Sequence, residues 1–132
     1  MSFLFKRKKK DDDVPVDPNA RSEQLGIRYK DLAVMGQLMQ QGADVSKPRH
    51  ALYYLYFESV EAVEVAADEA RVPGYSCQVH ETPNQPGSWT LICERPDAVL
   101  DPPGVIAADN LFQGIADRHE ADYDGWEAAA QP

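Results

Sequence analysis

The chain has 132 residues, of which 43% are hydrophobic, and a formal net charge of −9. That length holds one domain with a modest core, and that hydrophobic fraction excludes a chain that is disordered throughout. The negative charge lies in the domain: from Pro18 onward, 8 basic side chains stand against 18 acidic ones, a net of −10. Because such a surface repels phosphate backbones, we expect a protein partner and no direct nucleic-acid binding by the acidic domain.

No stretch of eighteen or more apolar residues occurs in the sequence, so no segment is predicted to span a membrane. The opening MSFLF is too short for the apolar region of a secretory signal, and it precedes the charges instead of following them. Two cysteines make no disulfide framework, which is typical of a reducing compartment. We therefore expect a cytoplasmic protein.

Residues 1–20 predict a disordered arm, because a basic run, an acidic run and two prolines follow each other there. A second interpretation is weak contact with an anionic membrane surface, since a short apolar segment and a basic run together supply the two signals that anchoring needs. The residues that would make this membrane or anion contact are Phe3, Leu4, Phe5, Lys6, Arg7, Lys8, Lys9 and Lys10.

Residues 21–42 predict an amphipathic helix that ends at Gly42. Gly26 and Gly36 each weaken this helix by roughly 1 kcal/mol relative to alanine, so we expect it to need a surface to lie on. Its apolar stripe, at steps of three and four residues, is Leu25, Tyr29, Leu32, Met35 or Gly36, and Met39.

The run HALYYLYFES at 50–59 predicts a strand with two apolar faces, one carrying Tyr54 and Tyr56 and the other Tyr53 and Leu55. Such a strand is typical of the middle of a sheet that is covered on both sides. The next segment predicts a helix with Ser59 at its N-cap, ended by the Pro-Gly pair at 73–74. The residues expected on its inner side are Val60, Val63, Ala67 and Ala70.

The segments YSCQVHE at 75–81 and SWTLICE at 88–94 predict a hairpin in which Cys77 lies opposite Cys93. DPPGVIAADNLFQGIADRHE then predicts a helix with Asp101 at the N-cap and Pro102 at its first position. A last short strand follows at ADYDGWEA. The inner stripe expected for the helix is Val105, Ala108, Phe112, Ile115 and His119.

After the first helix, the order strand, helix, strand, strand, helix, strand predicts an α+β fold, the ferredoxin-like βαββαβ sandwich. In that fold two helices lie on one face of a four-stranded antiparallel sheet, and right-handed crossovers place the first and third strands in the centre. We expect the extra N-terminal amphipathic helix to cover the other face. The predicted organisation is an arm at 1–20 and a single domain at 21–132, with a helix at 21–42 and a core at 48–128.

No motif in the sequence predicts catalysis, a metal site or a cofactor. Cys77 and Cys93 are expected to be core thiols instead of a disulfide or, with His80, part of a metal site, because no CxxC or HxxxH spacing occurs. His50 and His119 lie in other elements, and His119 is expected to be structural. GxSxG, HExxH and glycine-rich phosphate loops do not occur either. We therefore expect a non-enzyme without a metal or cofactor.

The aromatic strand invites comparison with RNA-binding sheets, in which exposed rings stack on bases. Those sheets work in a positive field, whereas this domain carries a net charge of −10 from Pro18 onward. We therefore expect Tyr54 and Tyr56 to be buried or packed beneath a helix.

The motif DYDGWEA at 122–128 has two interpretations. A glycine within a strand marks a bulge or a close backbone approach, and Gly125 stands just before a large ring. Either Trp126 packs against a neighbouring strand or helix, or it anchors a partner at the sheet edge. For the second interpretation the partner-binding residues are Tyr123, Asp124, Gly125, Trp126 and Glu127.

A strand, a helix that ends in Gly74 and Tyr75, a strand reading TLIC at 90–93, a long helix and then YDGW at 123–126 together resemble the family of regulator of ribonuclease E activity B, RraB. The resemblance covers roughly residues 50–127, and the helix before them more loosely. It implies a small non-catalytic protein that binds ribonuclease E, the endonuclease that organises bacterial RNA decay, and inhibits it. It does not account for the basic arm.

Two functions compete on this basis. In the first, the acidic domain occupies basic RNA-binding segments of a ribonuclease E-type scaffold by complementary charge. In the second, the chain is a small-molecule-binding domain or small enzyme, because this fold hosts many unrelated activities. Its pocket would lie between the first helix and the sheet, near Tyr54, Tyr56 and His80. A third function, a peripheral membrane adaptor, rests on the arm alone.

Overall fold

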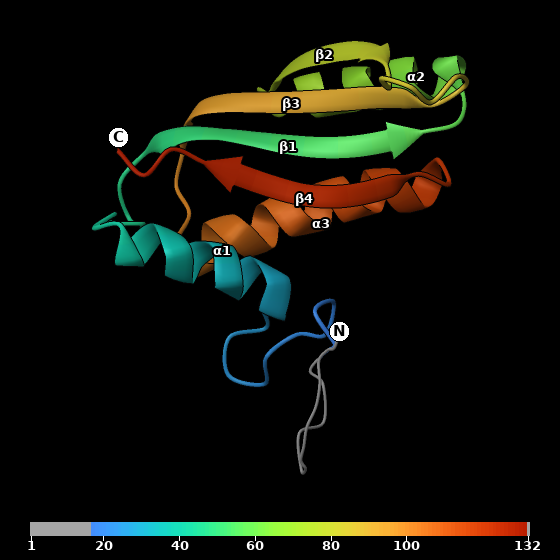
Figure 1. The fold of residues 1–132 in the computed structure, drawn as a ribbon. Helices are drawn as coiled ribbons and strands as arrows, with labels where there is room; N and C mark the ends of the chain where they lie inside the picture. The colour runs from blue at the N-terminus through green and yellow to red at the C-terminus, as the bar shows by residue number, and fades with distance from the viewer. Residues whose placement is uncertain (1–16, 132) are drawn as a thin grey trace.

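The computed structural model describes residues 17–131, and its elements form one antiparallel sheet with helices packed against it (Figure 1). In chain order they are α1 (Tyr29–Gln40), β1 (Arg49–Phe57), α2 (Val60–Arg71), β2 (Ser76–Glu81), β3 (Trp89–Ala98), α3 (Pro102–Arg118) and β4 (Asp122–Ala128). The four strands lie in the order β2-β3-β1-β4. The predicted βαββαβ order, with the first and third strands in the centre, is confirmed.

The helices α2 and α3 begin where their capping residues predict. The Ser59 side chain accepts a hydrogen bond from the Ala62 amide at 3.2 Å, and Asp101 accepts one from the Gly104 amide at 3.0 Å. Gly104 is needed for space, since a Cβ there would lie 1.9 Å from the Val99 carbonyl oxygen. These local signals fix both helices over the sheet.

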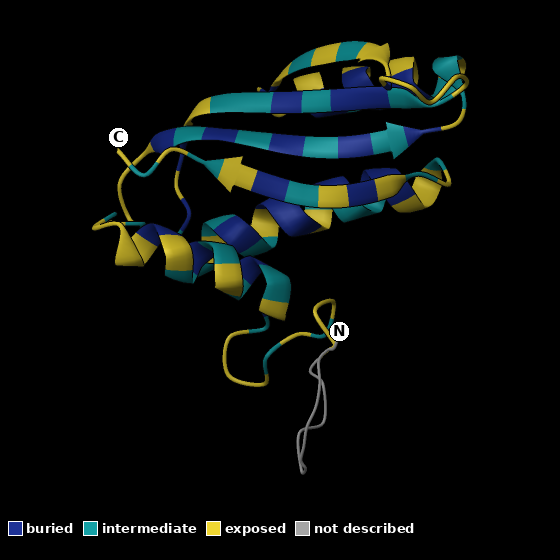
Figure 2. Ribbon diagram, in the orientation of Figure 1, coloured by how far each residue is buried: buried dark blue, intermediate teal, exposed yellow. Residues whose placement is uncertain are grey.

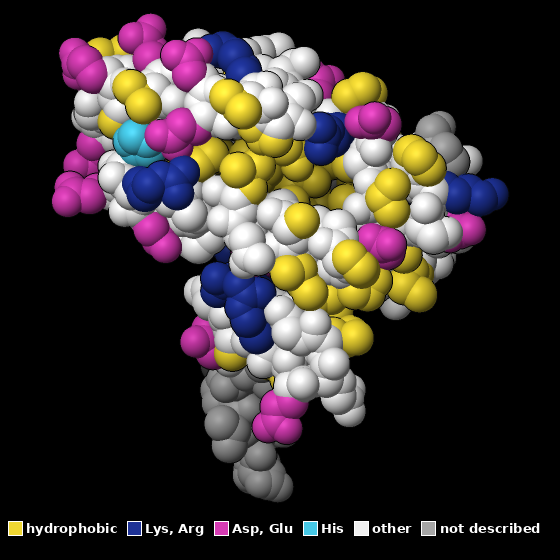
Figure 3. All heavy atoms as spheres, turned by 180° about the vertical axis from the view of Figure 1, so that it is seen from behind, with side chains coloured by type: hydrophobic (Ala, Val, Ile, Leu, Met, Phe, Trp, Pro, Cys, Tyr) yellow, Lys and Arg dark blue, Asp and Glu magenta, His cyan; other side chains and the backbone are white. Residues whose placement is uncertain are grey.

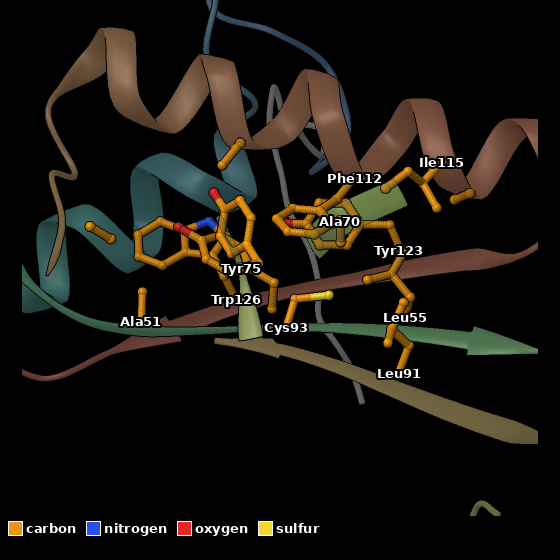
Figure 4. Close-up of a cluster of buried hydrophobic side chains, with 14 of the residues drawn as sticks. Ala51, Leu55, Ala70, Tyr75, Leu91, Cys93, Phe112, Ile115, Tyr123 and Trp126 are labelled. Carbon is orange, nitrogen blue, oxygen red and sulfur yellow. The ribbon is translucent and has the colours of Figure 1, made fainter. Parts of the chain in front are cut away.

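The core lies between the sheet and the helices, and the burial pattern of β1 shows which face of the sheet it occupies. Along that strand buried and half-buried residues alternate (Figure 2). The buried set faces α2 and α3, where Phe112 (labelled in Figure 4) stacks on Tyr53 with 4.7 Å between the ring centroids. The Tyr75 ring meets the Phe112 ring edge-on, with 5.0 Å between the ring centroids. Tyr53, Tyr75 and Phe112, of which Phe112 was predicted on the inner side, therefore fill a single packed layer.

The first helix differs from its prediction in length and in the face it buries. It begins at Tyr29, because residues 21–28 turn back on themselves and the Ser22 amide donates to the Ile27 carbonyl at 2.9 Å. The predicted stripe is wrong in part: Met35 is buried as expected, whereas Leu25 and Met39 are 47% and 59% exposed. Besides Met35, α1 buries Asp31 and Leu38.

The position of α1 also differs from the prediction. The indole Nε1 of Trp126 donates to Asp31 at 3.0 Å, and Trp126 pairs across the ladder with Tyr53, which faces the helices. The helix therefore packs on the same side of the sheet as α3 (Figures 1 and 4). The predicted cover for the other face is wrong, because polar contacts far apart in sequence hold α1 against β4 and α3.

Residues 17–20, which were predicted as part of the arm, contact the start of α1. The Tyr29 amide donates to the Ala20 carbonyl and the Lys30 amide to the Pro18 carbonyl, each at 3.0 Å, so residues 17–20 are tied to the start of α1. The membrane or anion contacts predicted at 3–10 lie outside the described residues. Between residues 17 and 131, none of the helices is both long enough and apolar enough to cross a bilayer.

Candidate functional site

Within residues 17–131 no helix covers the sheet face that points away from α1, α2 and α3, and this face is the candidate site. We call it the open face. Three rows of the ladder build it, in which Leu52, Tyr54 and Tyr56 of β1 pair with residues of β3 and β4. The side chains on it are His50, Leu52, Tyr54, Tyr56, Ser76, Gln78, His80, Thr90, Ile92, Glu94, Asp122 and Glu127.

Tyr54 and Tyr56 are half-buried on this face, and no described helix packs over them. The prediction that they lie beneath a helix is wrong. A tyrosine ring tolerates this position because its body packs against neighbouring strand residues while its hydroxyl reaches water. The open face therefore presents aromatic and aliphatic surface at the centre of the sheet.

Two side-chain pairs order the polar groups of the open face. The Tyr54 hydroxyl donates to Glu127, and Nε2 of His50 binds Glu94. The bond to Glu127 raises the pKa of Tyr54 to about 12, because ionisation of the phenol would place a second negative charge beside the carboxylate. Tyr54 thus stays neutral, and both carboxylates are held beside the central apolar residues.

A β-bulge in β4 shapes the edge of this face. Tyr54 pairs with Gly125 and Leu55 pairs with Tyr123, which leaves Asp124 as the extra residue. Gly125 has a φ of +119°, a conformation that a residue with a Cβ rarely adopts. The bulge expected from the glycine is confirmed. It turns both Tyr123 and Trp126 to the helix side, although their odd spacing places them on opposite faces of a regular strand.

Trp126 is a packed residue, 9% exposed, which agrees with the first interpretation of the motif. Its partner Asp31 is only 3% exposed, and burial raises the pKa of that carboxyl, an effect that the bond from Trp126 partly offsets. Tyr123 is buried as well. Of the five residues predicted to bind a partner, only Asp124 and Glu127 are exposed, and Gly125 is half-buried.

A buried carboxylate on α3, Asp109, also holds the segment before α1 in place, and the sequence did not predict this role. Asp109 is 3% exposed and binds Arg21 at 2.6 Å and Arg28 at 3.0 Å. These pairs attach the segment before α1 to α3. The available signal was an acidic residue among the apolar positions of α3, together with two arginines shortly before α1.

The thiols and histidines form no catalytic arrangement. Cys77 and Cys93 are opposite each other as predicted, and both are free. The hydrogen bond with the Cys77 sulfur, 3.5 Å away, and then burial raise the pKa of Cys93. His119 caps α3 and lies 3.2 Å from Glu69. Within residues 17–131 no group of three or more His, Cys, Asp or Glu side chains is placed to hold a metal ion.

The pocket predicted between the first helix and the open face does not form, since α1 lies on the other side. A hollow of about 570 Å³ lies instead on the helix side, against α3, where Figure 3 shows a depression lined by hydrophobic side chains. Its cation, Arg95, lies over the Tyr75 ring at 4.5 Å and donates to the Pro73 carbonyl at 2.7 Å. That guanidinium is therefore held by contacts within the domain.

Comparison of the sequence with models of protein families identifies the family of this chain. The family model described as regulator of ribonuclease activity B, RraB, matches residues 30–128, which run from the first turn of α1 to the end of β4 and include the β-bulge. No curated protein matches the chain. The matched range spans the sheet and all three helices, and the chain belongs to the RraB family of regulators of ribonuclease activity.

Proposed function

We propose that this protein is a non-catalytic cytoplasmic regulator that binds a ribonuclease E-type endonuclease and lowers its activity through protein contact, thereby slowing RNA decay. The observation that carries the proposal is the family match over residues 30–128, since it covers the whole folded sandwich and not a fragment of it. The charge of the domain supports the same partner.

Most of the basic side chains among the described residues contact carboxylates or carbonyl groups of the domain itself. Among the described residues, one buried arginine, Arg49, donates to the Ala129 and Ala130 carbonyls. The arginines that form ion pairs within the domain are Arg21, Arg28, Arg71, Arg95 and Arg118. A partner therefore meets a surface that attracts basic segments and repels RNA.

Charge complementarity gives a physical route to inhibition. Ribonuclease E-type scaffolds contain basic segments that bind RNA, and an acidic protein on such a segment competes with RNA for the same charges. No bond to the RNA needs to form or break on this protein. Because long-range attraction between exposed charges is screened by ions, this binding weakens as the salt concentration rises.

The β4 edge is the part of the predicted site that we retain for partner contact. Asp124 and Glu127 are exposed there, and the bulge at Gly125 sets their direction. Tyr123 and Trp126 act indirectly in this proposal, by holding β4 against the core. For residues 3–10 the proposed role remains weak contact with an anionic membrane surface.

The direct test is cleavage of a labelled RNA by purified ribonuclease E with increasing amounts of this protein. We expect the cleavage rate to fall to a plateau, and the inhibition to weaken as salt is raised. A ribonuclease lacking its basic RNA-binding segment serves as the control and should be unaffected. An unchanged cleavage rate, with no binding in a parallel titration, would falsify the proposal.

A further inference from the structure

We infer that the open face of the sheet, with the adjoining β4 edge, binds an arginine-containing basic segment of the partner. In this arrangement arginine side chains lie over Tyr54 and Tyr56 and pair with Glu94 and Glu127. The identification of that segment with the basic region of a ribonuclease rests on the proposed function. The chemistry of the surface is argued from this chain alone.

The first argument is the apolar centre of the open face. Leu52, Tyr54 and Tyr56 follow each other on β1, and Ile92 lies directly opposite Tyr54 on β3. All four are half-buried, so each retains surface that a partner would remove from water. A contiguous patch of this kind, surrounded by polar residues, is typical of interaction sites on soluble proteins.

The second argument is the sign of the charge around that centre. In the row through Leu52, both neighbours across the ladder are glutamates, Glu94 and Glu127, and Asp122 lies opposite Tyr56. No lysine or arginine belongs to the residues that form the open face. The partner that complements an apolar centre with a carboxylate rim is a basic segment.

The third argument is the match between these groups and a guanidinium. A planar guanidinium stacks on aromatic rings and binds carboxylates through two parallel bonds. The bonds from Tyr54 to Glu127 and from His50 to Glu94 hold the carboxylates beside the rings. The helix side of the molecule already contains such a contact, where Arg95 lies over Tyr75 and beside Asp97.

The same tyrosines do not favour RNA, although they form an aromatic strand in the centre of a sheet. Platforms that stack bases add a positive field for the phosphates, and the carboxylates on this face have the opposite effect. The charge thus selects between two ligands that both stack on tyrosine. It selects the basic peptide.

The test compares two double variants with the same change in net charge. Glu94→Gln with Glu127→Gln alters the open face, whereas Glu61→Gln with Glu64→Gln alters two exposed residues on α2. Each glutamine keeps an oxygen that accepts hydrogen bonds. Binding is measured to a short labelled peptide of alternating arginine and serine and to the purified basic segment of ribonuclease E, and melting temperatures verify folding.

We expect the open-face pair to raise both dissociation constants about tenfold and the α2 pair to raise them about twofold. If the ribonuclease binds and the two pairs weaken that binding equally, the open face is not the binding surface, and the proposed function stays intact. A ribonuclease that does not bind would overturn the proposed function. The binding surface would then be tested by the arginine peptide alone, and equal effects of the two pairs on that peptide would contradict it. A peptide of residues 1–16 that binds the open face more tightly than the ribonuclease segment would overturn the choice of occupant.

Discussion

The two faces of the sheet contain similar residues and do different things. On the helix side of β1, Tyr53 and Leu55 are 2% and 0% exposed and pack against the aromatic layer of α3. On the open face, Leu52 and Tyr54 are half-buried and lie beside glutamates. The apolar residues of β1 are therefore fully buried on one face only, and we propose that those on the other face bind a partner.

The largest expected effect comes from breaking the helix side at its centre. Phe112→Ala removes a ring that is 0% exposed and lies within 5.6 Å of Tyr53, Tyr75 and Tyr123 between centroids. We expect a loss of about 3–5 kcal/mol in the free energy of unfolding, measured by urea denaturation. The control is Tyr29→Ala on the outer side of α1, which should cost about 0.5 kcal/mol or less. Similar losses for both would contradict the assignment of the core.

A second prediction concerns the hydrogen bond that holds α1 on the helix side. Trp126→Phe keeps an aromatic ring but leaves the buried Asp31 carboxylate without its donor, so we expect a loss of about 1–3 kcal/mol. Combining it with Asp31→Leu should recover part of that loss, because both polar partners are then removed. Additive losses in the double variant would show that the two residues do not depend on each other.

The bulge that turns Tyr123 and Trp126 to the helix side gives a third effect, of about the same size as the second. No atom lies within 4 Å of a Cβ built at Gly125, so Gly125→Ala acts through the positive φ alone and should cost about 1–3 kcal/mol. Gly36→Ala is the matched control, because its Cβ also meets nothing within 4 Å and its position is helical. That change should stabilise the protein by about 0.5–1 kcal/mol. Thermal unfolding of the two variants would reveal opposite shifts, and shifts in the same direction would argue against the strained glycine.

The smallest effect is a pH dependence that originates on the helix side. Burial raises the pKa of Asp31 above the ordinary 3.8, so the folded chain keeps this proton to a higher pH than the unfolded chain. Ionisation of Asp31 therefore lowers stability as pH rises through that interval. Asp31→Asn still accepts a bond from Trp126 and lacks this ionisation. Its unfolding free energy, relative to the original protein, should increase from acid to neutral pH, and a constant difference would contradict the burial argument.

The sequence predicted those parts of the fold that depend on neighbouring residues. Ser59 and Asp101 capped their helices as expected, and alternation placed Cys77 opposite Cys93. The sandwich followed from the order of these elements. In the candidate site, Gly125 predicted the bulge for the same reason, since a glycine before a large ring is a local signal.

The position of α1 was not predictable in this way. The bond between Trp126 and Asp31 joins residues 95 positions apart, and that between Arg28 and Asp109 joins residues 81 positions apart. Apolar periodicity ignores buried carboxylates, so it assigned the wrong face of the helix and the wrong side of the sheet. Because α1 was expected to cover the second face of the sheet, the open face and the exposure of Tyr54 and Tyr56 were not predicted.

One pair of variants tests the division between the two faces most directly. Leu55 and Leu52 lie on the same strand, but their side chains point to opposite faces of the sheet. Leu55→Ala should lower the unfolding free energy by about 2–5 kcal/mol, whereas Leu52→Ala should lower it by about 1 kcal/mol or less. For the affinity of folded protein for ribonuclease E we expect the reverse: no change for Leu55→Ala and a loss of about fivefold or more for Leu52→Ala. Unchanged affinity in Leu52→Ala, or a loss of stability as large as that of Leu55→Ala, would contradict the account.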